Sequence, residues 1–331
     1  MKFNLARQSF FPAFFTLAAL AATAVYAPHA GETAATAAAS ASDSVLWLPG
    51  ELLQRFQAAF PQWAQALTCL LIVIAGTRAG YLPVHYNLYT ANTCLAIPFF
   101  GIVACGLTAG LADLFTFVAV LLLVLSIRNF CRSYSPNYAF DAIFRGSLYL
   151  GTLVIVCPKA SPLLLLLPLA LIQFHRTVRE LIIALAGVLL PALTLCYVNW
   201  GAGHPFLDPM IALGHEIIRG ELFSVFFGRT LLSQFLGGAL LFSFVLGISA
   251  FQAELYAISV KAKRILAFHI EAMLLIAVAA ALPSAPTAVF ALAAVPAAVI
   301  APWFFIRTHP IVAQPAYLLL LGGALANVYL Q

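Results

Sequence analysis

Charged residues are scarce in this chain. Asp, Glu, Lys and Arg make up 8% of its 331 positions, whereas hydrophobic residues make up 63%. Soluble globular domains carry about 25% charged residues and about 45–50% apolar ones. A folded soluble domain needs a polar skin, and this chain does not have enough polar residues to form one. The composition excludes an ordinary soluble domain and predicts that lipid is the solvent for most of the chain.

The sequence also lacks the short motifs of several enzyme classes. It contains no GxxxxGK[ST] phosphate-binding loop, no GxSxG nucleophile turn and no HExxH zinc motif. Its apolar runs lack the series of Asp, Glu and His that is typical of many proton relays. These absences argue against an ATPase, a hydrolase of these types and a classical proton pump.

The six cysteines lie in or beside apolar runs and show no CxxC spacing. This pattern favours small buried hydrophobic residues over a metal site or disulfides, and we predict neither a metal nor a cofactor. The net charge is +5, but Lys and Arg form no cluster interleaved with aromatic residues. We therefore expect no nucleic-acid partner, and basic residues in cytoplasmic loops explain the excess charge.

Eleven apolar runs are read as membrane-spanning helices, which need about 20 mostly apolar residues. They predict an all-α fold, in which residues 1–331 form a single polytopic bundle without a separate soluble domain. The sixth run is short. The predicted spans are 9–27, 63–82, 88–107, 111–127, 139–158, 162–175, 181–200, 230–251, 265–283, 287–306 and 311–330.

The first span has two interpretations. Val25-Tyr26-Ala27 resembles a signal-peptidase site, and Lys2 and Arg7 precede the apolar stretch. We favour a retained helix, because large aromatic residues occupy it and the later topology needs it to begin at the cytoplasmic face.

The distribution of Lys and Arg in short loops predicts the orientation. The positive-inside rule places the N terminus in the cytoplasm and the C terminus outside, in a bacterial cytoplasmic (inner) membrane. The inner residues are then Lys2, Arg7, Arg78, Arg128, Arg132, Arg176, Arg179, Lys261, Lys263, Arg264 and Arg307, and the outer ones Arg55, Lys159, Arg219 and Arg229.

Two outer loops, 28–62 and 201–229, are longer than turns. The first begins with an Ala/Ser/Thr-rich segment, residues 31–44, which has too few bulky residues to fold alone and is expected to be flexible. It continues with a short amphipathic piece, Glu51 to Phe60. The second has apolar and polar positions at near-helical spacing, which predicts a helix along the outer interface.

Prolines within the predicted spans indicate kinks or breaks, because proline removes a backbone donor. These residues are Pro168, Pro191, Pro296 and Pro302.

Two charged clusters near the predicted inner face are candidate sites for lipid phosphate. Asp141 and Arg145 lie four residues apart, which places both on one helical face. They are either a local ion pair or part of a site for an anionic head group. In the second cluster Arg176 is spaced to pair with Glu180, which leaves Arg179 for phosphate.

The outer face carries the candidate acids of an alternative hypothesis. Membrane glycosyltransferases of the C fold class place a catalytic carboxylate in the first outer loop. This chain has a similar coarse layout, with Asp43 and Glu51 in that loop, and Asp113 is a further acidic residue at the predicted outer face. The layout supports the hypothesis of an enzyme that uses one of these three carboxylates.

From Trp47 to about Trp200 the sequence resembles an uncharacterised family of multi-pass bacterial envelope proteins, catalogued as a domain of unknown function. The resemblance implies a polytopic inner-membrane fold, and it supplies no activity or catalytic residues. It rests on Leu48-Pro49 with Phe60-Pro61, the loop His85 to Asn92, Phe140-Asp141-Ala142-Ile143-Phe144-Arg145-Gly146, and Arg176 to Ile182 leading to Gly187-Val188-Leu189-Leu190-Pro191.

Three functions stay open at this point. The first is an accessory, non-enzymatic envelope protein whose partners are membrane lipid, lipid-linked glycan or other envelope proteins. The second is a polyprenyl-phosphate-dependent glycosyltransferase or glycan polymerase. The third is a secondary transporter, which needs polar residues at a broken helix, and Pro296 and Pro302 mark its expected position.

Overall fold

The structure, a computed structural model, describes residues 8–26, 49–108, 113–134, 138–220, 230–283 and 285–330. Within these ranges every regular element is a helix, which confirms the all-α prediction. The elements are α1 (Phe10–Tyr26), α3 (Pro49–Ala59), α4 (Pro61–His85), α5 (Ala96–Leu107), α6 (Leu114–Arg132), α7 (Phe140–Val156), the 3-10 helix η2 (Pro158–Leu165), α8 (Leu166–Gln173), α9 (Val178–Gly201), α10 (Asp208–Ile218), α11 (Leu231–Ala253), α12 (Val260–Ala281), α13 (Ala288–Ile300), α14 (Pro302–Arg307) and α15 (Pro310–Leu330).

Seven segments are long and apolar enough to cross a membrane. They are α4, α6, α9, α11, α12, the consecutive pair α13 and α14, and α15. Shorter apolar helices are α1, α5 and the consecutive pair η2 and α8. The 17-residue helix α7 carries Asp141 and Arg145. Each of the eleven ranges predicted from the sequence overlaps one of these helices or helix pairs.

The prolines act differently from one another. Pro302 separates α13 from α14, so the predicted break is present there. Helices α8, α9 and α13 continue through Pro168, Pro191 and Pro296 without ending. Near the break at Pro302 the Tyr89 hydroxyl donates to the carbonyl of Val299 at 2.7 Å. A side chain from another segment thus satisfies a carbonyl in the last turn before the proline.

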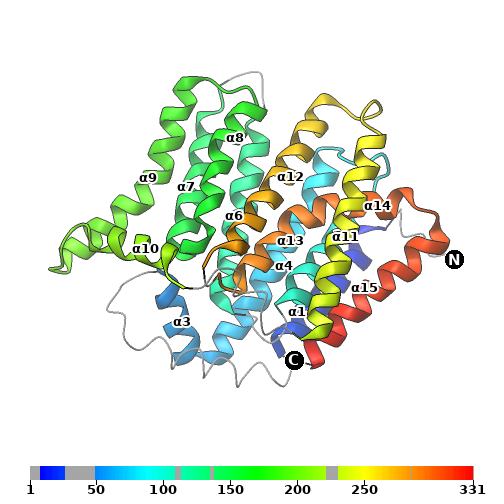
Figure 1. Cartoon of the computed structure of the whole chain (residues 1–331), viewed down its shortest axis with the longest axis horizontal. Coiled ribbons are helices and arrows are strands. Elements are labelled where there is room, and N and C mark those ends of the chain that lie inside the picture. The colour runs from blue at the N-terminus through cyan, green and yellow to red at the C-terminus, as the bar shows by residue number, and fades with distance from the viewer. Residues whose placement is uncertain are drawn as a thin grey trace.

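Helices α6, α7 and α9 lie side by side at one edge of the bundle, and α11, α14 and α15 lie at the other, with α13 between them (Figure 1). Helices α7 and α9 pack closely, because each helix presents a glycine to the other's backbone. A Cβ atom at Gly151 would lie 2.6 Å from the carbonyl oxygen of Val188, and one at Gly187 would lie 2.8 Å from that of Phe144. Small residues at these positions allow the two backbones to approach.

Each of the two long loops contains a short helix, as the amphipathic piece in the first and the near-helical spacing in the second indicated. These are α3 in the first loop and α10 in the second, and they lie at the same end of the bundle (Figure 1). The segment 31–44 and Asp43 lie outside the described residues, and so does the side chain of Glu51 in α3.

Candidate functional site

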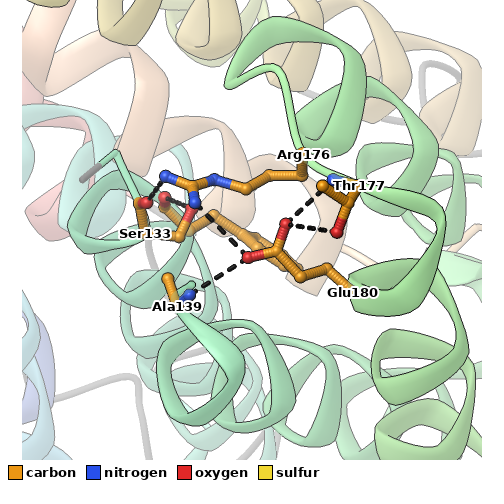
Figure 2. Close-up of polar contacts among 6 residues, drawn as sticks. Ser133, Ala139, Arg176, Thr177 and Glu180 are labelled. Atoms are coloured by element: carbon orange, nitrogen blue, oxygen red, sulfur yellow. Dashed lines mark hydrogen bonds and ion pairs between the residues drawn. The ribbon is translucent and has the colours of Figure 1, made fainter. Parts of the chain in front are cut away.

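Three helix ends meet around one buried carboxylate. Ser133 follows α6, Ala139 precedes α7, and Thr177 precedes α9. We call the cluster of Ser133, Ala139, Arg176, Thr177 and Glu180 the polar junction (Figure 2). It forms where it does because α7 packs tightly between α6 and α9.

The start of α9 is a capping box, in which Thr177 is the N-cap and Glu180 is the third helical residue. The backbone N–H of Thr177 donates to Glu180 Oε2 at 2.9 Å. Thr177 Oγ1 lies 3.3 Å from the same oxygen. The first turn of a helix leaves backbone donors without partners, and this motif satisfies them. The Thr-x-x-Glu spacing is a sequence signal for this cap that the sequence analysis missed.

The other carboxylate oxygen of Glu180 joins α9 to its neighbours. Oε1 accepts from the backbone N–H of Ala139 at 3.0 Å and lies 3.3 Å from Arg176 Nη1. Arg176 Nη2 donates to the carbonyl of Ser133. Figure 2 shows the carboxylate between the guanidinium and the start of α7. One acidic side chain and one basic side chain therefore fix three helix ends together.

Burial separates Arg176 from the other predicted lipid-contacting residues. The side chains of Arg176 and Glu180 are 7% and 1% exposed. Their i,i+4 pairing is the one predicted from the sequence, and it is confirmed. Arg179, on the next turn, is exposed. The polar junction thus engages Arg176 inside the protein and leaves Arg179 at the surface.

Asp141 and Arg145 also pair as their spacing predicts. Arg145 Nε lies 2.7 Å from Asp141 Oδ1, and the two side chains are 56% and 64% exposed, Arg145 first. The pair belongs to the first two turns of α7, directly after Ala139 of the polar junction. The structure therefore brings Asp141 and Arg145 close to the polar junction, on the surface of the bundle.

A second set of contacts at the same end joins α4, α6, α8 and α12. Lys261 Nζ lies 4.8 Å from the ring centroid of Tyr86 and 5.6 Å from that of Tyr134. Arg264 lies over the Tyr134 ring at 5.9 Å, and its Nη1 donates to the carbonyl of Gln173 at 2.9 Å. Cation–π contacts of this kind tie the start of α12 to the ends of the other three helices.

The pKa of the Tyr86 phenol reflects both burial and positive charge at this end of the bundle. Burial raises the pKa of Tyr86 to about 12, and the positive charges of Arg128 and Arg132 oppose that rise. Both arginines are exposed, at the end of α6.

We call this end of the bundle, where α4, α6 and α8 finish and α7, α9 and α12 begin, the basic end. Its cations belong to helix ends and to the turns next to them. They are Arg128, Arg132, Arg145, Arg176, Arg179, Lys261, Lys263 and Arg264.

The opposite end, with α3 and α10, holds the remaining predicted acid. Gln57 Nε2 of α3 donates to Asp113 Oδ1 at 3.0 Å, and Gln57 Oε1 accepts from the N–H of Leu114 at 2.9 Å. Burial raises the pKa of Asp113, and the hydrogen bond from Gln57 opposes that rise. Asp113 therefore links the start of α6 to α3. Asp43 and the Glu51 side chain lie outside the described part of the chain.

Lys159, a charge that the sequence analysis did not explain, caps α10. Its side chain is buried, and Nζ donates to the carbonyls of Ile217 at 3.2 Å and Arg219 at 2.8 Å. A cation at a helix C terminus satisfies free carbonyls and the helix dipole. The contact joins residues about 60 positions apart, so no local sequence motif predicts it.

Metal ligands were not predicted, and the described residues contain no group of three or more His, Cys, Asp or Glu side chains placed to hold a metal ion. His269 is fully buried in α12, with Nδ1 2.7 Å from the carbonyl oxygen of Ile265. That contact lies within one helical turn of its own helix.

In comparisons with known proteins, no family model, no curated protein and no solved structure matches this chain. The resemblance to the envelope-protein family stays a prediction from the sequence.

Proposed function

We propose that this chain is a multi-pass protein of a bacterial cytoplasmic membrane whose basic end faces the cytoplasm and binds the phosphate groups of anionic lipids. In this proposal the chain crosses the membrane eleven times, with its N terminus inside and its C terminus outside. It acts as an accessory envelope protein through contact with lipid or lipid-linked glycan.

The observation that carries the proposal is the concentration of exposed arginines at one end of the bundle. Arg128, Arg132, Arg145 and Arg179 are exposed there, on α6, α7 and α9. Basic residues near a membrane are retained on the cytoplasmic side, where lipids are anionic. Each such residue contributes about 1 kcal/mol to attraction toward an anionic leaflet.

Arg145 and Arg179 are the residues best suited to phosphate. The exposed pair of Arg145 with Asp141 is of a kind that stabilises a protein by about 0–1 kcal/mol, so a lipid phosphate competes with it readily. Guanidinium groups bind phosphate oxygens in a bidentate manner. Removing Arg176 from Glu180 would instead leave a buried charge, at a cost of about 3–5 kcal/mol. Arg176 is therefore assigned a structural role.

The two alternatives receive less support from the described residues. A glycosyltransferase needs a carboxylate that reaches substrate, whereas that of Asp113 accepts a hydrogen bond that joins α3 to α6. A transporter needs polar groups for its substrate at a broken helix. Near the break at Pro302, the Tyr89 hydroxyl already donates a hydrogen bond to the carbonyl of Val299.

Lipid retention tests the proposal. The purified full chain would be transferred from detergent into the mass spectrometer with phosphatidylglycerol or phosphatidylcholine added. We expect the native chain to retain phosphatidylglycerol preferentially, and the Arg145→Gln/Arg179→Gln variant to lose that preference. The matched control is Arg55→Gln/Arg219→Gln, which removes two cations from the opposite end. Equal retention by the two double variants would refute the assignment of the basic end.

A further inference from the structure

A cavity lies between four helices, away from the polar junction. It has a volume of about 450 Å³ and is lined by residues of α5, α11, α12 and α13. Cavities that hold small ligands in proteins have volumes of about 300–1,000 Å³. The volume therefore exceeds that of a packing defect and suits a ligand or a segment of one.

The cavity exists because two consecutive helices diverge. Helix α11 packs mainly on α14 and α15, whereas α12 packs mainly on α13 and η2. The walls between α11 and α12 consist largely of small residues, such as Gly237, Gly238, Ala277 and Ala280. A Cβ atom added at Gly238 would meet nothing within 4 Å. The gap between α11 and α12 is therefore not filled by side chains.

All four helices place this cavity at the same depth. It is lined by the first half of α11, the last turns of α12, most of the length of α13 and the last turns of α5. Because α12 begins at the basic end, its last turns lie at the opposite end, as Figure 1 shows. The cavity therefore occupies the half of the bundle remote from the basic end.

The lining is suited to hydrocarbon. None of the described residues that line the cavity is charged, and the polar ones among them, Ser233 and Gln234, both lie in the first turn of α11. Leu241 on its wall is 61% exposed, so the cavity opens toward the surface of α11. Helices α11 and α12 are both apolar enough to cross a membrane, so lipid tails surround that surface. An apolar cavity takes up apolar ligands in preference to water.

We propose that this cavity binds one acyl chain of a phospholipid from the leaflet at the start of α11, with its polar head group beside Ser233 and Gln234. The orientation of the site follows from its chemistry, because among the described lining residues the polar ones lie at the first turn of α11. The site is separate from the basic end and does not depend on phosphate binding there. With the topology proposed above, the leaflet is the outer one.

Filling the cavity tests this assignment. Gly238 lines the cavity and an added Cβ there meets nothing within 4 Å, so we expect the side chain of Gly238→Trp to occupy the volume without displacing packed atoms. The matched control is Gly322→Trp on α15, where an added Cβ also meets nothing within 4 Å. Both variants would be checked for folding by size-exclusion chromatography and thermal unfolding.

The readout is photolabelling in nanodiscs of phosphatidylethanolamine and phosphatidylglycerol that contain a phospholipid with a diazirine in its acyl chain. We expect adducts to concentrate on Leu241, Met273 and Ala277. Labelling there should fall several-fold in Gly238→Trp and stay at the native level in Gly322→Trp. Adducts spread evenly over the surface of the bundle, or equal labelling of both variants, would overturn the proposal.

A second measurement identifies the occupant in the native membrane. A photoreactive p-benzoylphenylalanine at position 277 would be irradiated in cells and its adducts analysed by mass. An adduct with the mass of a phospholipid supports the proposal. An isoprenoid adduct, a cross-link to residues 221–229 of the same chain, or a cross-link to a second protein would each overturn it.

Discussion

Two ion pairs of identical spacing lie at the same end of this molecule and differ in almost every other respect. Asp141 and Arg145 pair across one turn of α7 with more than half of each side chain exposed. Arg176 and Glu180 pair across the first turn of α9 with at most 7% of either side chain exposed. The first pair uses only atoms of its own helix, whereas the second also holds backbone groups of α6 and α7.

The difference shows that i,i+4 spacing predicts that two charged side chains pair, but it does not predict how buried the pair is or how much stability is lost when it is broken. In the polar junction, backbone donors and the guanidinium surround the Glu180 carboxylate, so its desolvation is compensated. On α7 the charges remain solvated, and their attraction is small. Breaking the buried pair should therefore be costly, whereas breaking the exposed pair should cost little.

Glu180→Ala should have the largest effect. It leaves Arg176 buried without its carboxylate and removes acceptors from Ala139 and Thr177, which should cost about 3–5 kcal/mol. Thermal unfolding in detergent would measure the loss. Asp141→Ala is the matched control, because it breaks a pair of equal spacing at the same end. If the two variants unfolded at the same temperature, burial would not be what distinguishes the pairs.

Replacing both members of the buried pair sharpens that result. Arg176→Met/Glu180→Leu removes both charges, so no uncompensated charge stays inside. We expect the double variant to regain part of the stability lost in Glu180→Ala. The recovery should be incomplete, because the N–H groups of Ala139 and Thr177 still lack their acceptor. A double variant less stable than Glu180→Ala would contradict this account, and a double-mutant cycle would measure the coupling.

Thr177→Ala should have an intermediate effect, because it removes the side chain of a helix N-cap. Loss of such a cap costs about 1 kcal/mol, within a range of 0.5–2 kcal/mol. Thr177→Ser keeps the hydroxyl and serves as the control in the same unfolding experiment. An alanine variant as stable as the serine variant would show that Glu180 alone satisfies the start of α9.

Asp113 predicts a pH dependence at the opposite end. Burial holds its pKa above the ordinary 3.8, so the folded state binds this proton more tightly than the unfolded state. The stability that Asp113 contributes is full below its ordinary pKa and is lost as the pH rises through its folded pKa. Asp113→Asn should therefore unfold with a flatter dependence on pH in the acidic range just above 3.8. Thermal unfolding across that range would show an unchanged slope if Asp113 were solvated.

Asp141→Ala should have the smallest effect on stability, about 0–1 kcal/mol. Its effect on lipid should be opposite in sign to that of Arg145→Gln, because Asp141 competes with phosphate for the same guanidinium. Retention of phosphatidylglycerol would rise in Asp141→Ala and fall in Arg145→Gln. A fall in both variants would mean that the ion pair itself, rather than the free arginine, recognises lipid.

Hydrophobic runs predicted the helices well, because the apolar length of a helix is a local property of the sequence. The same locality explains both ion pairs, since Asp141 with Arg145 and Arg176 with Glu180 need only one helical turn. The partners of this buried pair in other segments are backbone groups, the Ser133 carbonyl for Arg176 and the Ala139 N–H for Glu180, and these have no side-chain signature. Recognition of the capping box at Thr177 would have indicated that the Glu180 carboxylate accepts a hydrogen bond from the start of α9.

Other features depend on distant residues and were therefore not predicted. Lys159 finds its carbonyl acceptors in α10, and Gln57 finds Asp113 more than 50 positions away. Kinks or breaks were expected at four prolines, and of these only Pro302 lies at a break between two helices. Proline is compatible with the interior of a helix whose freed backbone groups find other partners. The apolar cavity is lined by residues of four helices that mix small and large apolar side chains, and their sequence alone resembles ordinary helix packing.

The position of Glu180 in the sequence also determines when its contacts can form during synthesis of the chain. A ribosome synthesises the start of α7 first, and the carboxylate that satisfies the N–H of Ala139 follows 41 residues later. Until then the junction of α6 with α7 lacks both the acceptor at Ala139 and the donor that Arg176 brings to Ser133. The hydrogen bond that ties the start of α7 to the start of α9 can therefore form only after translation has passed residue 180.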